Sequence, residues 1–492
     1  MVAVSTQDER AAVEQAPTQL RVGGEWRSAT SGERFAVEDP STGETLAEVA
    51  DGGPDDALAA LDAAASAQEA WAAYPPRERG EILRRAFEEL NRRVDDLALL
   101  MTLEMGKPLR ESKAEVVYAA EFFRWFSEEA VRIDGRYSTS TDGRARTIVL
   151  RQPVGPALLI TPWNFPLAMG TRKIGPAIAA GCTMVIKPAQ ETPLSMLALA
   201  ALLEEVGLPP GVVNVVPTTS AARTTGPLFD DLRLRKLSFT GSTEVGRVLM
   251  AQAAKNILRT SMELGGNAPF LVFEDADLDA AVDGAMVAKM RNLGESCVAA
   301  NRFYVAERVA TDFGNRLAER MGGLTVGRGT EEDTDVGPLV NAMQQGKVSE
   351  LVEDAVKRGA GYALEGGIVD GPGHFYRPAV LTDVPGDARL LREEIFGPVA
   401  PIVTFTDEDE AVAAANDTEF GLVAYVYTRD ITRALRVIEK LDTGMVGLNR
   451  GIVSNPAAPF GGVKQSGVGR EGGREGIDEY LEVKHVAVGL GD

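Results

Sequence analysis

The sequence is poor in the residues that bind metals or form disulfide bonds. Only two cysteines, Cys182 and Cys297, and two histidines, His374 and His485, occur among its 492 residues. It has no C-x-x-C pair, and no cysteine lies near a histidine. The ligand spacing of a zinc site is therefore missing, and we expect no metal. Two isolated cysteines also fit a reducing compartment better than a disulfide framework, which predicts a cytoplasmic protein.

Long apolar runs are missing as well. The longest nearly uncharged apolar stretch, residues 174–186, is shorter than the roughly 20 residues that cross a bilayer. Charged residues interrupt the N-terminus from Asp8 onward, so it lacks the apolar segment of a secretory signal. We therefore expect no membrane partner, and we expect a short flexible tail over residues 1–17.

Basic residues are outnumbered. The chain has 72 acidic and 51 basic residues, a formal net charge of −21, and no local basic patch. Such a chain repels phosphate backbones, so we expect no nucleic-acid partner. Hydrophobic residues make up 45% and charged residues 25%, the composition of a globular protein. The length predicts two to four domains.

Apolar periodicity predicts an α/β fold. Helices are expected first, over residues 55–74, 77–105 and 112–133. From residue 157 onward, short apolar runs alternate with helical stretches, which predicts a parallel sheet covered by helices. The expected strands are 157–160, 183–186, 212–216 and 236–239, with helices over 193–206 and 243–255. A second series near 269–273, 302–305 and 400–405 predicts a second lobe, with a cleft between the two.

Polar and small residues follow several of these strands. Residues 162–164, Lys187, Gly241 and Ser242 all come directly after predicted strands. Ligands of parallel α/β sheets gather at the carboxyl ends of the strands. The segment 241–246 also opens a helix, so its N–H groups could hold a phosphate, although a helix N-cap by Ser242 explains the pattern equally well.

Two side chains are candidates for covalent chemistry. Cys297 follows a polar, glycine-containing segment, whereas Cys182 lies at the entry to an apolar strand and is interpreted as structural. An isolated cysteine is more often a core residue than a nucleophile, and a lone glutamate such as Glu263 is more often a cap or a surface charge. A nucleophilic Cys297 would need a base or a positive environment nearby.

Taken together, these segments resemble the aldehyde dehydrogenase superfamily from about residue 20 to the C-terminus. Seven motifs occur in that family's order, and their coincidence by chance is negligible. They are TPWNFP (161–166), IKPAQETP (186–193), FTGSTEVG (239–246), MELGGNAP (262–269), the segment ending at Cys297, EEIFGP (393–398) and PFGGVKQSGVGRE (459–471).

The resemblance implies a mechanism. Cys297 would attack the aldehyde carbon to give a thiohemiacetal, and hydride transfer to a nicotinamide would leave a thioester. The side-chain amide of Asn164 and the backbone N–H of Cys297 would stabilise the oxyanion. Glu263 would be the general base that activates Cys297 or the hydrolytic water, a role that favours a raised pKa. The presence of Glu263 favours a hydrolytic rather than a CoA-acylating enzyme.

The resemblance also implies a cofactor site. Lys187 would bind the adenosine ribose, Gly241 and Ser242 the phosphates, and Glu394 the nicotinamide ribose. The remaining cofactor residues would be Trp163, Asn164, Pro188, Ala189, Gln190, Leu264 and Phe396. Many relatives have a glutamate at the position of Gln190 that repels a 2′-phosphate. The neutral Gln190 therefore favours NADP+ over NAD+, although Glu191 could still disfavour NADP+.

Within the superfamily, the chain resembles the succinate-semialdehyde dehydrogenases most. Arg172, Arg291 and Ser454 match that group's carboxylate-binding set, and guanidinium groups bind carboxylates through charge-assisted hydrogen bonds. Either arginine could instead form a structural ion pair. Glu295, where many relatives have glutamine, is expected to add a negative charge near the pocket. Ala299 cannot form an inactivating disulfide with Cys297.

Alternatives to this substrate remain. One is oxidation of a longer semialdehyde, such as glutarate semialdehyde, or of uncharged aldehydes broadly. Another is a non-catalytic binding or structural protein built on the same fold. The joint presence of Cys297, Glu263 and Asn164 argues against a non-catalytic role.

The resemblance finally implies a domain organisation. The Rossmann-like NAD(P)-binding domain would comprise residues 18–134 and 154–264, and the catalytic domain residues 265–474. Residues 135–153 and 475–492 would form a small β extension for oligomerisation, since 144–151 and 479–488 have strand-like composition. In the family such segments pair between subunits, so we expect a homodimer or a homotetramer.

Overall fold

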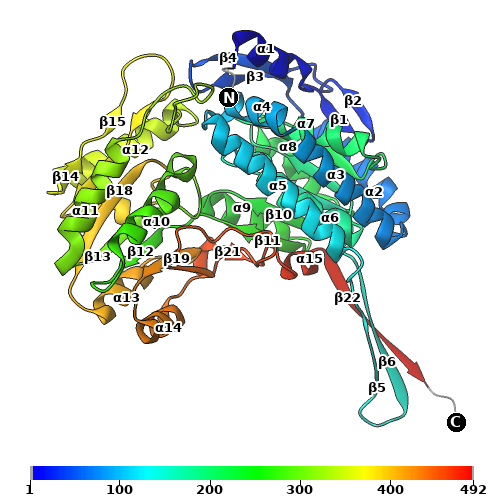
Figure 1. Ribbon diagram of the computed structural model, residues 1–492. Coiled ribbons are helices and arrows are strands. Elements are labelled where there is room, and N and C mark those ends of the chain that lie inside the picture. Colours follow the sequence, from blue (N-terminus) through cyan, green and yellow to red (C-terminus); the bar gives the residue numbers. More distant parts are fainter. Residues whose placement is uncertain (1–3, 490–492) are drawn as a thin grey trace.

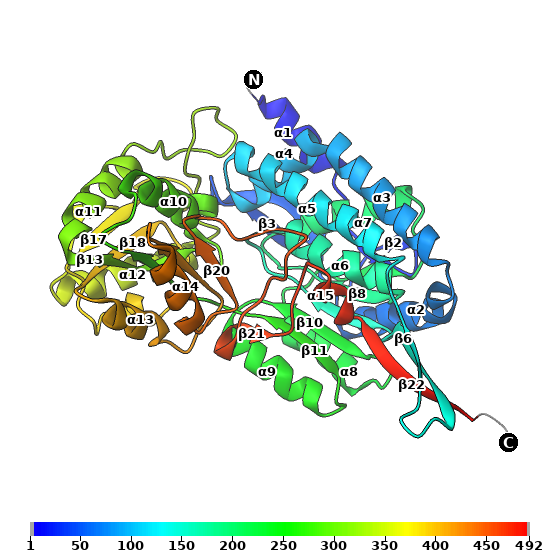
Figure 2. The ribbon, with the colours of Figure 1, turned by 60° about the horizontal axis from the view of Figure 1, so that its bottom comes forward.

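The computed structural model describes residues 4–489, which form two α/β lobes and a projecting antiparallel arm (Figure 1). The outermost positions of the two predicted end segments, 1–3 and 490–492, lie outside the described residues. The lobes correspond to the two series of apolar runs in the sequence. Figure 2 shows the second lobe beside the first, with α9 and β21 where the two approach each other.

The first lobe is built on an eight-stranded sheet of order β2-β1-β9-β8-β7-β10-β11-β21. Its five central strands, β9 to β11, run parallel, and the outer ones are antiparallel. The strands are β1 (Leu20–Val22), β2 (Glu25–Arg27), β7 (Ala157–Ile160), β8 (Met184–Lys187), β9 (Val213–Val215), β10 (Lys236–Thr240), β11 (Arg259–Glu263) and β21 (Gly467–Val468). β7 and β10 are buried along their whole length, because helices cover both faces of such a sheet.

The first lobe also contains several helices. They are α2 (Pro54–Ala72), α3 (Pro76–Arg92), α4 (Val94–Met105), α5 (Leu109–Glu129), α6 (Ala168–Ala180), α7 (Pro193–Glu205), α8 (Ala221–Asp230), α9 (Thr243–Ala254) and α15 (Glu475–Asp478). In α3, Ile82, Leu83, Ala86 and Leu90 are buried, which is the spacing of one helix face. A hairpin of β3 (Arg34–Asp39) and β4 (Glu44–Ala50) lies beside α4.

The second lobe contains a seven-stranded sheet of order β14-β17-β18-β13-β12-β19-β20. Its strands are β12 (Ala268–Val272), β13 (Ala300–Ala306), β14 (Gly361–Leu364), β17 (Ala379–Thr382), β18 (Val399–Phe405), β19 (Val423–Tyr427) and β20 (Met445–Leu448). Its helices are α10 (Leu278–Met290), α11 (Glu307–Gly322), α12 (Ala342–Lys357), α13 (Glu408–Asn416) and α14 (Ile431–Lys440), and β15 (Gly367–Ile368) pairs with β16 (Tyr376–Arg377). Only β14 pairs antiparallel in this sheet.

The arm is a three-stranded antiparallel sheet that points away from both lobes (Figure 1). It consists of β5 (Arg136–Thr139), β6 (Ala145–Pro153) and β22 (Leu481–Gly489). β22 joins β6 over the register Leu481↔Pro153 to Gly489↔Ala145. Large apolar side chains on the arm face solvent, Tyr137 at 67% and Val483 at 66% exposure.

The structure corrects two predicted segments. The helix predicted over 77–105 is two helices, α3 and α4, because Arg93 between them adopts a non-helical φ of −104° and ψ of 23°. The flexible tail predicted over 1–17 contains the helix α1 (Thr6–Gln15), which begins with a capping box between Ser5 and Asp8. Capping boxes stabilise helix starts, and Glu9 pairs with Arg328 at 3.1 Å.

The segment after residue 463 joins the sheet of the first lobe, since β21 pairs antiparallel with β11 and extends that sheet. The side chain of Glu471 likewise reaches the buried residues Arg172 and Lys173 of α6. The C-terminal motif therefore crosses from the second lobe to the first.

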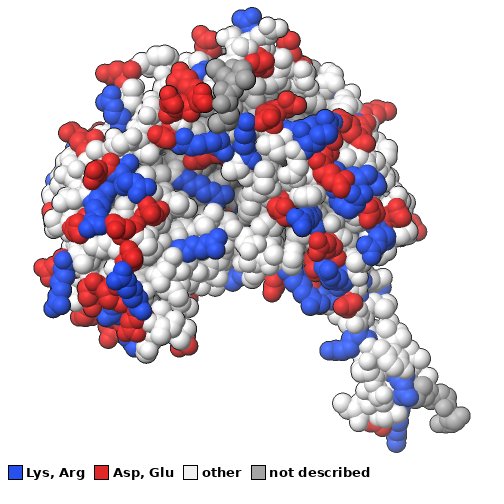
Figure 3. Space-filling model, in the orientation of Figure 1, with Lys and Arg blue, Asp and Glu red and all other residues white. Residues whose placement is uncertain are grey.

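The described residues carry neither a membrane-crossing helix nor a metal-binding cluster. No helix between residues 4 and 489 is long and apolar enough to cross a bilayer. Over the same range, no group of three or more His, Cys, Asp or Glu side chains is arranged to hold a metal. On the face seen in Figure 3, acidic and basic side chains are interspersed.

Candidate active site

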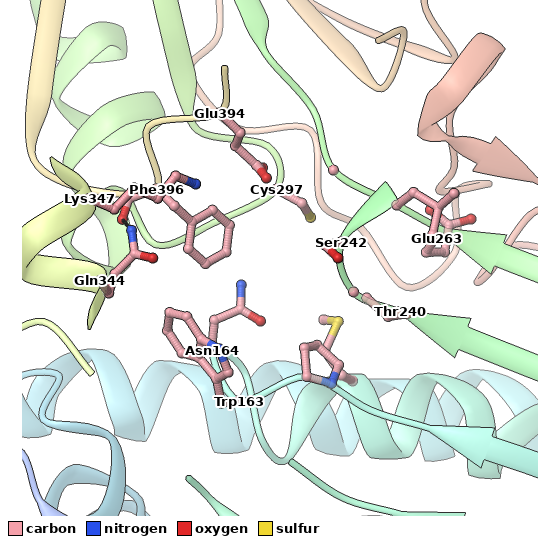
Figure 4. A pocket seen from close by; sticks show the side chains of 15 residues that line it. Trp163, Asn164, Thr240, Ser242, Glu263, Cys297, Gln344, Lys347, Glu394 and Phe396 are labelled. Carbon is pink, nitrogen blue, oxygen red and sulfur yellow. Dashed lines mark hydrogen bonds between the residues drawn. The ribbon is translucent and has the colours of Figure 1, made fainter. Parts of the chain in front are cut away.

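A cavity of about 190 Å³ lies between the two lobes, at the carboxyl ends of β7, β10 and β11. This is the position at which parallel α/β sheets bind ligands. Figure 4 shows the side chains that enter it from both lobes. The lining residues are Pro162, Trp163, Asn164, Met169, Thr240, Gly241, Ser242, Glu263, Leu264, Gly265, Cys297, Gln344, Lys347, Glu394 and Phe396.

Cys297 is presented on a sharply bent segment between α10 and β13. Three successive residues before it, Asn292, Leu293 and Gly294, have φ of 54°, 57° and 77°. At Gly294 a Cβ atom would lie 2.3 Å from the carbonyl oxygen of Gly397, so only glycine fits. Such backbone conformations cost energy and persist where the surrounding contacts enforce them.

Burial raises the pKa of the Cys297 thiol, Glu394 and Glu263 act in the same direction, and Arg172 and Arg291 oppose them. The resulting pKa is about 12, which favours the thiol over the thiolate at neutral pH. The thiolate is the nucleophilic form. The reaction therefore needs a group that removes this proton as the sulfur attacks.

Glu263 is the candidate for that base. It ends β11 and lines the same cavity, where Figure 4 shows it at the edge of the group of side chains, and neither carboxylate oxygen has a hydrogen-bond partner among the described residues. Burial, reinforced by Glu471, raises the pKa of Glu263 well above its ordinary value. Lys173 and Arg172 contact Glu471 and lower its pKa, so Glu471 ionises at lower pH than Glu263.

Asn164 follows β7 and points its amide into the cavity. Its Nδ2 donates to the Glu295 carbonyl oxygen at 2.9 Å. A side-chain amide carries two N–H donors, so one remains for an oxygen bound beside Cys297. This contact joins Asn164 to the segment that carries Cys297, as the predicted oxyanion site requires.

The structure brings most predicted cofactor residues to the cavity wall. Trp163, Asn164, Gly241, Ser242, Leu264, Glu394 and Phe396 line it. Lys187 ends β8, the strand beside β7, and Pro188, Ala189 and Gln190 follow it, but none of these four residues lines the cavity. The Ser242 Oγ accepts from the Val245 N–H at 3.4 Å, so Ser242 also caps α9.

These surroundings fit a nicotinamide dinucleotide. At Gly241 a Cβ atom would meet the Phe239 ring at 2.4 Å, and at Gly265 it would lie 2.9 Å from Glu394 Oε2, so bare backbone faces the cavity. The first turn of α9 offers N–H donors to an anion. Trp163 and Phe396 meet edge to face, with ring centroids 5.3 Å apart. Burial raises the pKa of Glu394 to about 7.

Several lining residues were not predicted from the sequence. Gln344 donates to the carbonyl oxygens of Ile395 and Phe396 at 3.2 and 2.7 Å, and the charge of Lys347 lowers the pKa of Glu394. Both lie on α12, an amphipathic helix whose polar face resembles any solvated surface. Met169 and Thr240 were also missed, although each lies in or next to a motif.

A second, smaller cavity shares Met169 and Cys297 with the first and holds the predicted substrate residues. It is lined by Tyr118, Phe165, Met169, Arg172, Arg291, Ser296, Cys297, Val298, Ser454 and Phe460. Arg291 lies over the rings of Tyr118 and Phe165 at 5.7 and 5.0 Å, and its Nη1 is 3.5 Å from Ser454 Oγ. Arg172 lies over Phe460 at 4.1 Å.

The two arginines differ in their electrostatic surroundings. The Nε of Arg172 is 2.9 Å from Glu471 Oε2, so the structural ion pair considered for this residue is present. Arg291 makes no ion pair within residues 4–489. Of the two guanidinium groups, Arg291 is therefore the one without a carboxylate in ion-pair contact, although its charge acts on Glu111, where it opposes the rise in pKa that burial causes.

Glu295 does not add the negative charge expected of it. Its side chain is fully buried and accepts the Val340 N–H at 3.2 Å through Oε1, while Oε2 has no partner in the described chain. Burial raises the pKa of Glu295 well above its ordinary value. The neutral acid is the favoured form, because a buried carboxylate with so few partners is costly to ionise.

The comparisons with known proteins agree with this geometry. Residues 26–486 match the model of the aldehyde dehydrogenase family. The chain is 59% identical to a succinate-semialdehyde dehydrogenase of Paenarthrobacter nicotinovorans, over 90% of this chain and 98% of that protein. It is 50% identical to a glutarate-semialdehyde dehydrogenase of Pseudomonas putida, over 96% and 98%.

Among solved structures, an NADP-dependent enzyme of Escherichia coli superposes with a TM-score of 0.95 at 50% identity, covering 96% of this chain and 98% of that one. The predicted α/β architecture is thus confirmed. The sequence motifs, the cavity that contains Cys297 and Glu263, and these similarities have one explanation: the chain belongs to the aldehyde dehydrogenase family.

Proposed function

We propose that the protein oxidises succinic semialdehyde to succinate, with NADP+ as the preferred oxidant. The observation that carries this proposal is the guanidinium of Arg291, which makes no ion pair among the described residues and lines the small cavity that Cys297 shares. A four-carbon semialdehyde has a carboxylate at one end and an aldehyde at the other. Its carboxylate would be the counter-ion of Arg291, with Ser454 donating a hydrogen bond and Arg172 adding a partly compensated charge.

The chain's own groups account for the addition step. Cys297 attacks the aldehyde carbon while Glu263 takes the thiol proton, since the thiol with a pKa of about 12 does not ionise unaided. The free N–H of Asn164 and the backbone N–H of Cys297 donate to the developing oxyanion. The product of this step is a thiohemiacetal on Cys297.

Glu263 also serves the second half of the reaction. Glu394 and the backbone at Gly241 and Ser242 would hold a bound nicotinamide cofactor, which would supply the hydride acceptor. With the hydride removed, Cys297 carries a thioester. After it has released the thiol proton to solvent, Glu263 removes a proton from water, which attacks the thioester carbon; the proton then passes to the departing Cys297 sulfur, and succinate is released. The buried carboxylate with a raised pKa suits repeated uptake and release of this proton.

The cofactor preference rests on Gln190. This side chain is exposed, close to the carboxyl end of β8, and carries no charge that would repel a 2′-phosphate. Lys187 would bind the adenosine ribose, with Pro188 and Ala189 shaping the turn beside it. The 50%-identical Escherichia coli structure is described as NADP-dependent, which supports the same preference.

Self-association is part of the proposal. The arm leaves Tyr137 and Val483 exposed, and burying such side chains against a second copy is favourable. We propose that residues 135–153 and 475–492 serve oligomerisation in a homodimer or homotetramer. Residues 18–134 with 154–264 would then bind the cofactor, and residues 265–474 would supply the catalytic cysteine.

The test is the initial rate of cofactor reduction by the purified protein, with succinic semialdehyde and with NADP+ or NAD+ at equal concentration. We expect a fast rate that is higher with NADP+. The 50%-identical Pseudomonas putida relative favours glutarate semialdehyde as the second candidate, so the five-carbon substrate is measured alongside. A higher kcat/KM for glutarate semialdehyde, or no rate with either cofactor, would overturn the substrate assignment.

A further inference from the structure

The main-chain carbonyl of Asn164 is held by two buried side chains that no step of the reaction uses. Lys107 Nζ donates to it at 2.8 Å, and Asn292 Nδ2 donates to it at 2.9 Å. Lys107 lies between α4 and α5, whereas Asn292 lies in the bend before Cys297. Two donors from different lobes therefore fix the residue whose side-chain amide faces the cavity.

Lys107 is itself held rigidly. Its Nζ is 2.5 Å from Glu115 Oε2 on α5 and 4.4 Å from the centre of the Phe165 ring, and both charged side chains are 1% exposed. The other oxygen of Glu115 accepts the N–H groups of Leu167 and Ala168 at 3.0 and 3.1 Å. Charge-assisted hydrogen bonds in a buried network are strong and leave little freedom. The chain on both sides of Asn164 is thus anchored to α5.

Asn292 ties the two catalytic segments together. Besides the Asn164 carbonyl, its Nδ2 donates to the Glu295 carbonyl at 2.9 Å, and the same Glu295 oxygen accepts Asn164 Nδ2. Its own N–H donates to Glu111 Oε2 at 2.6 Å, so the bend is also anchored to α5. The φ of 54° at Asn292 is one that asparagine tolerates better than most residues.

We propose that Lys107 and Asn292 are positioning residues that set the Asn164 amide and the Cys297 N–H in register around one oxygen. The proposal rests on the oxyanion role given to Asn164 in the proposed function. Donors stabilise an oxyanion when they lie about 2.7–3.1 Å from it, and a misplacement of about 1 Å costs roughly 100-fold in rate. Neither positioning side chain lines either of the two cavities described above.

Two reagents for Cys297 separate positioning from general damage. With p-nitrophenyl acetate, the sulfur adds to the ester carbonyl, Glu263 takes the thiol proton, and the carbonyl oxygen becomes an oxyanion. The tetrahedral adduct then expels p-nitrophenolate and leaves an acetyl thioester. With iodoacetamide, the sulfur displaces iodide from a CH2 group and no oxyanion forms. Cys182 is fully buried, so both reagents report on Cys297.

The variants are Asn292→Gly, in which glycine retains the positive φ, and Lys107→Met. We expect each to slow acylation by p-nitrophenyl acetate about 10- to 100-fold and to change alkylation by iodoacetamide less than about threefold. Matched controls are Asn214→Gly, whose amide also donates to two carbonyls, and Lys236→Met, whose buried ammonium donates to Ser261. Both controls should leave the two rates within about threefold.

Asn164→Ala is the reference variant. It should slow acylation, and adding Asn292→Gly to it should have little further effect, because Asn292 acts through Asn164. If Asn164→Ala does not slow acylation, the oxyanion role in the proposed function is wrong. If Asn164→Ala slows acylation, three results for Asn292→Gly would overturn the positioning proposal. They are an unchanged acylation rate, an equal slowing of acylation and alkylation, and an acylation rate in the double variant that is reduced by the product of the two single effects. Asn292→Gly unpairs no buried charge and decides the question alone if Lys107→Met does not fold.

Discussion

Replacing Arg291 with methionine tests the substrate assignment most directly. Methionine retains much of the apolar packing against Tyr118 and Phe165 and removes the guanidinium, which makes no ion pair in the described structure. A hydrogen bond to a charged group contributes about 1.5–3 kcal/mol, which corresponds to about 10- to 150-fold in binding. Arg172 cannot replace it fully, because Glu471 lies 2.9 Å from its Nε.

The assay is the steady-state rate of cofactor reduction with succinic semialdehyde and with butanal, which has the same chain length without the carboxylate. We expect Arg291→Met, like Arg291→Ala, to raise the KM for succinic semialdehyde about 10- to 150-fold and to change that for butanal less than about threefold. The matched control is Arg21→Met, since that guanidinium also lies over an aromatic ring, Trp26, at 5.2 Å. An equal loss with both aldehydes would refute the reasoning, because it would make Arg291 a structural residue.

Three further outcomes follow from the site and the arm. Glu263 must be ionised to act as a base, and burial raises its pKa. The value of kcat should therefore fall with decreasing pH at a pH well above the ordinary glutamate pKa of about 4.3. A Glu263→Gln variant should turn over about 100-fold or more slowly and should lose this fall at low pH. Gln190→Glu should raise the KM for NADP+ about tenfold relative to that for NAD+, through repulsion of the 2′-phosphate, and equal changes in the two values would contradict the assignment. Val483→Arg on the arm should lower the molar mass measured by light scattering without altering the circular dichroism spectrum, and an unchanged mass would remove Val483 from the interface.

The sequence predicts strands better than breaks between helices, for physical reasons. β7 and β10 are short runs buried on both faces, and such runs have no other stable location than the middle of a covered sheet. The break between α3 and α4 is a single residue, Arg93, with no glycine or proline to mark it. The helix α1 was missed because its sequence is polar and none of its residues is fully buried.

The residues of the site likewise fall into those that the sequence predicts and those that it does not. Residues in glycine-rich or cysteine-containing motifs were found, because such motifs meet chemical demands that few other residues satisfy. Gln344 and Lys347 were missed, because the polar face of a helix has the same pattern whether it faces solvent or a cavity. Glu295 was found but given the wrong charge, since its pKa depends on burial that the motif does not encode.

Arg172 and Arg291 show most clearly what the sequence cannot predict about the site, because they are the same residue type in the same small cavity. The sequence assigns them one joint role in binding a carboxylate. In the folded chain, β21 brings Glu471 back across the first lobe, where it contacts Arg172 and Lys173. A cation that already has a carboxylate partner gains less from a second one than an unpaired cation does. Specificity for a charged substrate should therefore depend more on Arg291 than on Arg172, a difference set by a contact between segments almost 300 residues apart.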